Sequence, residues 1–255
     1  MGDITPKEAQ KLAKTHLSKW EKGVITTSST PFPPANQSNK VLIGNKEGGN
    51  QATINLTYAV DLKPNSEDRI KATLMNEILG GGSFQARLFQ NLREKHAFTY
   101  GAYSDLNVDK YVGNFSASAD VRLAITDSAF TEIIKEMNTL QTELVTNEQL
   151  QLVKNSITGS FGRSMEEPAT IARFELNIDR YNLPADYYTT YLQKVEAVTP
   201  EAIKAMALKY LKPNNAFLVA VGDSASLTPM LKKLTPKNEI EYYDFEGKKK
   251  IDILP

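Results

Sequence analysis

The segment of residues 70–111 constrains the fold most, because the spacing of its apolar residues changes part-way along it. The apolar residues first recur at helical spacing, and glycines at 80–82 divide them into two predicted helices. After Phe98 the period changes to two, which is typical of a strand with one buried face. The segment therefore predicts a helix, a glycine break, a second helix and a strand that carries Tyr100 and Tyr103.

Further strands are predicted from alternating or continuous apolar runs. Residues 100–108 and 111–121 are expected to form an antiparallel hairpin with its turn at residues 107–110. Residues 51–62 alternate as a half-buried strand does, and residues 216–221 form a short apolar run typical of a buried strand. These strands lie on both sides of a long region with helical periodicity.

Helix starts are marked by local capping signals. Ser66 with Glu67 and Asp68 predicts the start of the first helix in the segment described above, where the two acids complement the N-terminal dipole. Thr146 with Gln149 forms a predicted capping box, and residues 199–200, Thr-Pro, mark another start. The tail from residue 238 is charged, and residues 248–250, three lysines, are expected to be solvated.

The N-terminal segment is predicted to be a helix followed by an extended linker. Thr5 and Glu8 form a capping box, whereas residues 23–40 are rich in Ser, Thr and Pro and lack periodicity. We expect the helix within residues 1–22 to close a preceding domain, and residues 41–255 to form the main domain. The apolar stripe of the helix consists of Ala9, Leu12, Ala13, Leu17 and Trp20.

Composition excludes several classes of function. Thirty basic residues balance thirty acidic ones, so no nucleic-acid partner is indicated, and no apolar run is long enough for a membrane span. The absence of cysteine excludes disulfides, thiolate nucleophiles and cysteine-ligated zinc. It leaves the compartment open between periplasm and cytoplasm.

The two histidines do not suggest a zinc site. His16 and His96 are far apart in the sequence, and neither belongs to a His-x-x-Glu-His motif. We therefore expect no self-contained catalytic metal site in this chain.

One pair of residues is a candidate for catalysis. Arg93 and Tyr100 lie seven residues apart within LREKHAFTYG. A guanidinium and a phenol that point at the same developing negative charge can stabilise an oxyanion. Alternatively, Arg93 is a surface residue that pairs with Glu94, and Tyr100 is a half-buried strand residue. The residues by themselves leave both interpretations open.

The resemblance of this sequence to a known family is clearest in the block LMNEILGGGSFQARLFQNLREKHAFTYGAYS. The block resembles the pitrilysin/insulinase family of zinc metallopeptidases, and most closely the C-terminal, non-zinc half of the short bacterial and processing-peptidase-like members. The resemblance extends over residues 41–234 and includes the strand sequence FLVAVGD. Residues 2–20 are similar to the closing helix of the family's first half.

This resemblance implies a two-layer α+β sandwich, the LuxS/pitrilysin-like metallohydrolase fold, with helices on one face of a mostly antiparallel sheet. Residues 41–255 would be the C-terminal peptidase domain, and residues 1–22 would belong to the preceding homologous domain. In the family, a homologous N-terminal half or subunit holds zinc, and the two halves enclose a chamber for peptides. Arg93 and Tyr100 match the arginine and tyrosine that hold the substrate and stabilise the tetrahedral intermediate.

Because the zinc motif is missing here, the chain alone is expected to bind no catalytic metal and to cleave nothing. With zinc in the partner half, the resemblance implies a zinc-dependent metalloendopeptidase. The alternative is a catalytically inactive scaffold or peptide-binding subunit, as some respiratory-complex core proteins of the family are. A generic peptide-binding module would need neither the partner nor the pair. Retention of Arg93 and Tyr100 favours the peptidase.

Overall fold

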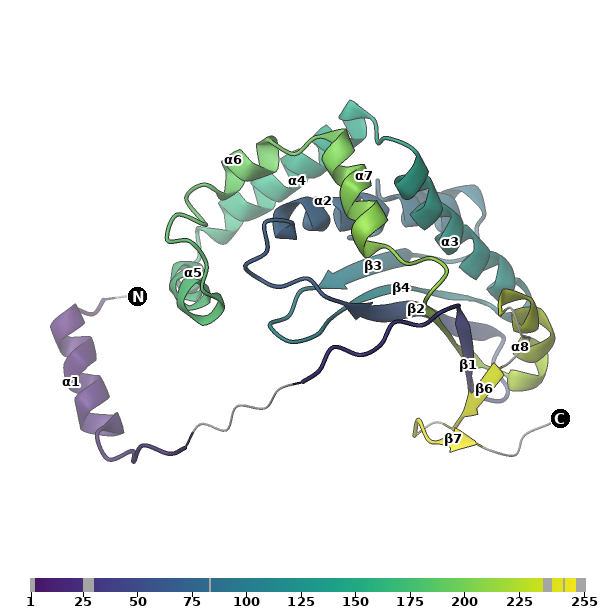
Figure 1. The fold of residues 1–255 in the computed structure, drawn as a ribbon, viewed down its shortest axis with the longest axis horizontal. Coiled ribbons are helices and arrows are strands. Elements are labelled where there is room, and N and C mark those ends of the chain that lie inside the picture. The colour runs from purple at the N-terminus through teal and green to yellow at the C-terminus, as the bar shows by residue number, and fades with distance from the viewer. Residues whose placement is uncertain (1–2, 25–29, 83, 236–239, 245, 251–255) are drawn as a thin grey trace.

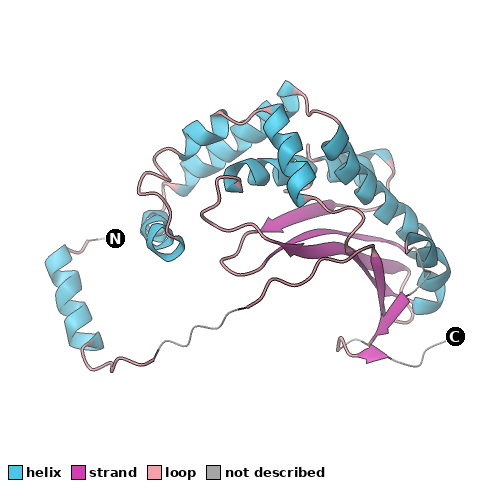
Figure 2. Cartoon of the chain, viewed as in Figure 1, coloured by secondary structure: helices cyan, strands magenta, loops and turns pink. Residues whose placement is uncertain are grey.

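The computed structural model describes residues 3–24, 30–82, 84–235, 240–244 and 246–250, and shows a sheet covered by helices on one face (Figure 1, Figure 2). Within these residues the sheet has seven strands, in the order β3-β4-β2-β5-β1-β6-β7. Strand β1 runs parallel to β5 and β6, and the other neighbouring pairs are antiparallel. The predicted two-layer α+β sandwich is therefore confirmed. The strands are β1 (Lys40–Asn45), β2 (Gln51–Val60), β3 (Ala102–Asn107), β4 (Gly113–Arg122), β5 (Phe217–Gly222), β6 (Ile240–Tyr243) and β7 (Lys249–Lys250).

The helical layer lies over the central strands, where α2 contacts β3, α4 and α7, and α3 contacts β2 and β4. The α-helices are α1 (Pro6–Leu17), α2 (Arg69–Leu79), α3 (Thr126–Thr142), α4 (Asn147–Ser164), α5 (Pro168–Tyr181), α6 (Tyr191–Glu196), α7 (Pro200–Tyr210) and α8 (Ser224–Leu231). Shorter helices are the π-helix η1 (Phe89–Lys95) and the 3₁₀ turns η2 (Leu123–Ile125) and η3 (Lys232–Leu234).

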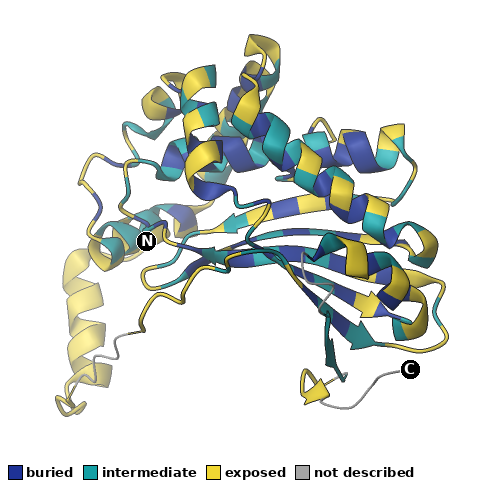
Figure 3. Cartoon of the chain, turned by 45° about the vertical axis from the view of Figure 1, so that its right-hand side comes forward, coloured by how far each residue is buried: buried dark blue, intermediate teal, exposed yellow. Residues whose placement is uncertain are grey.

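Alternation along the strands explains why the helices cover one face. On β2 every second residue is buried, and its cross-strand neighbours on β4 follow the same pattern (Figure 3). Burying this apolar face against the helices provides the main driving force for folding. The opposite face of β2 and β4 carries Thr, Asn, Ser and Asp side chains and is not covered by the helical layer (Figure 2).

Capping hydrogen bonds fix several helix starts where the sequence predicts them. Thr146 Oγ1 accepts a hydrogen bond from the backbone N–H of Gln149 at 3.1 Å, and Thr199 caps α7 in the same way. Thr5 and Glu8 form a complete capping box at α1. These local signals predict the positions correctly because each cap involves residues only three positions apart.

Helix α2 begins directly after Asp68, where the sequence predicts a helix start, but the Asp68 side chain makes no capping hydrogen bond. Its Oδ2 instead accepts hydrogen bonds from Lys209 Nζ at 2.6 Å and from the Tyr210 hydroxyl at 2.9 Å, while Lys71 Nζ lies 2.9 Å from Oδ1. The Lys209 ammonium, supported by Lys71 and Tyr210, outweighs the effect of burial and lowers the pKa of Asp68 to about 2. Asp68 thereby joins the start of α2 to the end of α7.

Other predictions need correction at the level of single elements. Phe84 begins the apolar repeat that predicts the second helix, yet it is 70% exposed. Leu144 ends the apolar repeat that predicts a helix from Phe130 onward, yet it lies beyond the end of α3 and is 51% exposed. The charged tail, for which no strand was predicted, contributes β6 and β7 to the sheet, although residues 248–250 are exposed as expected. Strand β1, which has no predicted counterpart, lies between β5 and β6.

Helix α1 forms as predicted but lies apart from the sheet (Figure 1). None of its residues is buried, and Trp20, the last residue of the predicted apolar stripe, lies beyond the end of α1 and is 81% exposed. Part of the predicted linker, residues 25–29, lies outside the described residues. Over the described part of the chain, no helix is long and apolar enough to cross a lipid bilayer.

Candidate active site

Arg93 lies on a π-helix rather than an α-helix. The backbone N–H of His96 donates to the carbonyl of Asn91, five residues earlier, at 3.1 Å. Ala97 follows in the left-handed conformation with φ of 51°. A π-helix is rare in proteins, and the left-handed conformation is uncommon for a residue other than glycine. Both features recur at functional sites. Together they end the helix and turn the chain toward Tyr100.

The structure brings Arg93 and Tyr100 to one hollow of about 490 Å³. Tyr100 lies in the loop before β3, not on the strand as predicted, and its side chain is 88% exposed. Among the described residues its hydroxyl has no hydrogen-bond partner, so it is free to donate to a ligand. The hollow is lined by Gln51, Arg93, Ala97, Phe98, Thr99, Tyr100, Asp120 and Arg122.

Arg93 also makes the contact that its alternative interpretation predicts. Its Nε lies 3.5 Å from Glu94 Oε1, and its guanidinium carbon lies 4.7 Å from the centre of the Phe89 ring. Both charged side chains are well exposed, at 40% and 54%, so the ion pair contributes about 0–1 kcal/mol. An interaction this weak leaves the guanidinium able to bind a ligand in the hollow.

A buried polar cluster supports the π-helix from behind. Asn91 is 6% exposed, and its Nδ2 donates to Glu132 Oε2 at 2.9 Å and to Glu136 Oε1 at 2.6 Å, both on α3. Burial would raise the pKa of Glu132, but hydrogen bonds from Asn91 and Lys135 outweigh it and lower the pKa. His96 Nε2 lies 3.8 Å from Glu132 Oε2. The helix that carries Arg93 is therefore tied to α3 by the hydrogen bonds of Asn91.

These residues do not fit a catalytic zinc site. In the part of the chain that the structure describes, no group of three or more His, Asp or Glu side chains is placed to hold a metal ion. His96 lies beside Glu132 in the buried cluster, and His16 lies on α1. We therefore derive no metal-dependent step from the residues of this chain.

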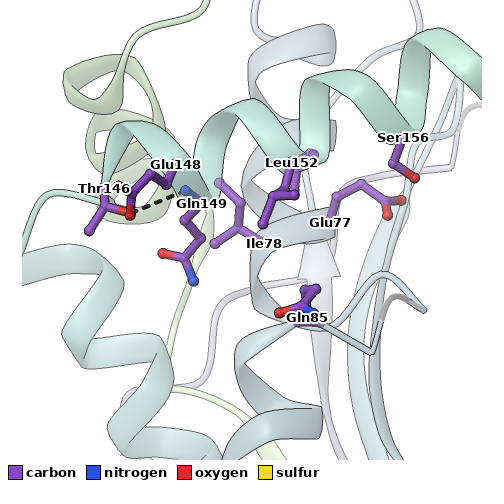
Figure 4. A pocket seen from close by; sticks show the side chains of 10 residues that line it. Glu77, Ile78, Gln85, Thr146, Glu148, Gln149, Leu152 and Ser156 are labelled. Carbon is purple, nitrogen blue, oxygen red and sulfur yellow. Dashed lines mark hydrogen bonds between the residues drawn. The ribbon is translucent and has the colours of Figure 1, made fainter.

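A second hollow, of about 500 Å³, lies between α2 and α4 (Figure 4). Figure 4 shows Glu77 of α2 beside Leu152 and Ser156 of α4. Burial, and to a smaller extent the charge of Asp105, raises the pKa of Glu77. Neither Arg93 nor Tyr100 lines this hollow, so it is separate from the candidate site.

The comparison with known sequences identifies the family. A family model described as the peptidase M16 inactive domain matches residues 1–157. The chain belongs to the peptidase M16 family. An uncharacterised zinc protease of Mycobacterium leprae strain TN is 26% identical to this M16 chain over 153 residues, 57% of this chain and 32% of that protein. The predicted membership of the pitrilysin/insulinase zinc metallopeptidases is thereby confirmed, and the matched domain is the inactive, non-zinc type.

Solved structures show the same fold. A peptidase M16 inactive domain from Pseudomonas fluorescens superposes with a TM-score of 0.76 at 24% identity, over 87% of this chain and 52% of that chain. A protease from Helicobacter pylori superposes with a TM-score of 0.74 at 18% identity, over 86% and 53%. The M16 chain thus spans about half the length of these structures and about a third of the curated relative.

The sequence did not indicate all the residues around the pair. Asp120 and Arg122 lie at the end of β4, and Gln51 lies opposite Arg122 at the start of β2. Their positions depend on the pairing register of the sheet. The alternation of β2 and β4 places them on the open face, but nothing in the sequence brings this face to Arg93.

Proposed function

We propose that this chain is the non-zinc half of a zinc-dependent metalloendopeptidase, in which Arg93 and Tyr100 hold the peptide and stabilise the oxyanion. The observation that carries the proposal is that both side chains line one hollow. Both are also able to donate: the Tyr100 hydroxyl has no partner among the described residues, and the contacts of Arg93 there are a weak, exposed ion pair with Glu94 and the Phe89 ring.

Each of these side chains would act by donating hydrogen bonds. During attack on a peptide carbonyl, negative charge develops on the carbonyl oxygen, and donors already in place stabilise it without reorganising. The Arg93 guanidinium supplies a positive charge with several N–H donors, and the Tyr100 phenol supplies one O–H donor. Losing one such donor typically lowers the rate by ~10²–10³.

A homologous half that carries His-x-x-Glu-His would complete the enzyme by supplying zinc and the attacking water. The exposed stripe of α1 supports such a pairing, because Leu12, Leu17 and Trp20 remain exposed in the chain alone, at 51%, 51% and 81%. We place residues 1–22 against that half, residues 23–40 as the linker and residues 41–255 as the C-terminal domain. The open sheet face would then line a chamber for peptides between the halves.

The test compares the chain alone with the chain combined with its zinc-bearing half, using an unstructured peptide library and added zinc. Cleavage only by the combination is expected. No cleavage from a folded, zinc-loaded combination would refute the peptidase proposal. The inactive scaffold or peptide-binding subunit would then be favoured, and the Arg93–Glu94 ion pair already fits that alternative.

A further inference from the structure

The hollow at Arg93 and Tyr100 continues into a neighbouring hollow of about 410 Å³. The two share Gln51 and Asp120 in their linings, so they form one groove along the edge where β4 ends and β2 begins. We call it the strand-end groove. This neighbouring hollow is lined by Lys46, Gly49, Asn50, Gln51, Thr53, Asp120 and Val221.

Strand register gives the groove its direction. Asp120 of β4 pairs with Thr53 of β2, and Thr53 pairs in turn with Val221 of β5. Neighbouring strands are ~4.8 Å apart, so the groove crosses ~10 Å from β4 to β5, the length of about three residues of an extended peptide. Arg122 therefore lies at the end near Arg93 and Tyr100, and Lys46 lies toward the other end.

The charges of the groove are unbalanced. Its lining contains three basic side chains, Arg93, Arg122 and Lys46, and one acidic side chain, Asp120. Asp120 Oδ1 already accepts a hydrogen bond from Thr53 Oγ1 at 2.6 Å. By contrast, the side chains of Arg122 and Lys46 form no hydrogen bond or ion pair with any described residue. An anionic ligand would neutralise them, whereas a basic ligand would be repelled.

From this geometry we infer that the strand-end groove selects peptides with acidic side chains. Arg122 binds an acidic side chain next to the peptide bond held by Arg93 and Tyr100, and Lys46 binds a second one about three residues away. The inference rests on the proposed function and gives it a substrate class. Arg122 and Lys46 are thus specificity-determining residues, and Asp120 is kept in place by Thr53.

The test uses matched peptides that carry Glu, Gln or Lys at single positions around the cleaved bond, with the chain combined with its zinc-bearing half. Wild type should prefer Glu over Gln by about fivefold at one position near the bond, as expected for an exposed ion pair. Arg122→Glu should reverse this preference toward Lys, and Arg122→Lys should retain it. Lys46→Glu should change the preference about three residues away and leave the first position unchanged.

Lys110→Glu is the matched control, because it makes the same charge change in the hairpin turn at the far end of β3 and β4, and it should leave all preferences unchanged. If Arg122→Glu cleaves with the preferences of wild type, the inference is wrong although the peptidase proposal stands. If no combination cleaves, the inference can still be tested by using NMR to measure how tightly the Glu and Lys peptides bind to the chain alone. Tighter binding of the Glu peptide, lost in Arg122→Glu, would support the inference, and equal binding would overturn it.

Discussion

Asn91 Nδ2 donates a hydrogen bond to Glu136 Oε1 at 2.6 Å, from the π-helix that carries Arg93 to the neighbouring helix α3. The same amide nitrogen also donates to Glu132 at 2.9 Å, so one buried side chain binds two carboxylates. This relationship fixes the position of the π-helix relative to the helical layer. Replacing Asn91 tests the stability of this arrangement, whereas replacing Arg93 or Tyr100 tests activity.

Replacing Asn91 with Leu should destabilise the fold. The change removes both hydrogen bonds and leaves two carboxylates, each 16% exposed, without the amide. Such losses cost about 1–3 kcal/mol in the free energy of unfolding. Urea unfolding of Asn91→Leu and of Asn155→Leu, an exposed control on α4, measures the difference. Equal stability of the two variants would contradict the role of the cluster.

Removing either donor of the candidate pair should lower turnover without changing the fold. In the combined enzyme we expect Arg93→Ala and Tyr100→Phe each to lower kcat by ~10²–10³. Zinc content and unfolding midpoints should match wild type, because both side chains are substantially exposed. Tyr111→Phe, which alters a 51% exposed tyrosine in the hairpin, is the control and should be fully active. Wild-type turnover in both test variants would eliminate the oxyanion role.

Acid should weaken the fold through Asp68. Its pKa in the folded protein is about 2, below the ordinary value near 4, so the folded state binds the proton less readily than the unfolded state. The contribution of Asp68 to the free energy of unfolding is therefore complete above about pH 4 and disappears as the pH falls toward 2. Because Lys209 is 60% exposed, we expect roughly 1 kcal/mol rather than the full value of the shift.

The measurement for Asp68 is the free energy of unfolding between pH 7 and pH 2, for wild type and Asp68→Asn. The two proteins should differ at pH 7 and converge near pH 2. Asp61→Asn, which removes a 62% exposed carboxylate beside Lys63, should follow wild type throughout. A constant difference between wild type and Asp68→Asn at every pH would mean that titration of this carboxyl contributes nothing.

Trp20 should report the docking of α1. It is the only tryptophan of the chain and is 81% exposed. If the apolar stripe of α1 packs on the zinc-bearing half, Trp20 emission should shift to shorter wavelength when the halves combine, because an apolar environment replaces water. Subtracting the spectrum of the Trp20→Phe combination isolates the signal of this residue. If the Trp20 emission is the same before and after the halves combine, Trp20 remains in water and the proposed docking of α1 is refuted.

Local features of this protein were determined by the sequence alone. Thr5, Thr146 and Thr199 cap helices at the predicted positions, because a cap depends on residues within one helical turn. The change of period after residue 98 predicted the β3–β4 hairpin for the same reason, since alternation is a property of consecutive residues. The block around Arg93 and Tyr100 also sufficed to indicate the family that the comparisons confirm.

Tertiary structure decided which distant residues meet. Asp68 accepts a hydrogen bond from Lys209 across 141 positions, which its place before a helix does not predict. Thr53 and Asp120 meet across 67 positions, and only strand register puts Asp120 in the hollow that Arg93 lines. Such contacts form because burying apolar faces sets the register and packing of whole elements, and polar side chains at their ends meet as a result. The pair is therefore visible in the sequence, whereas the groove around it exists only in the fold.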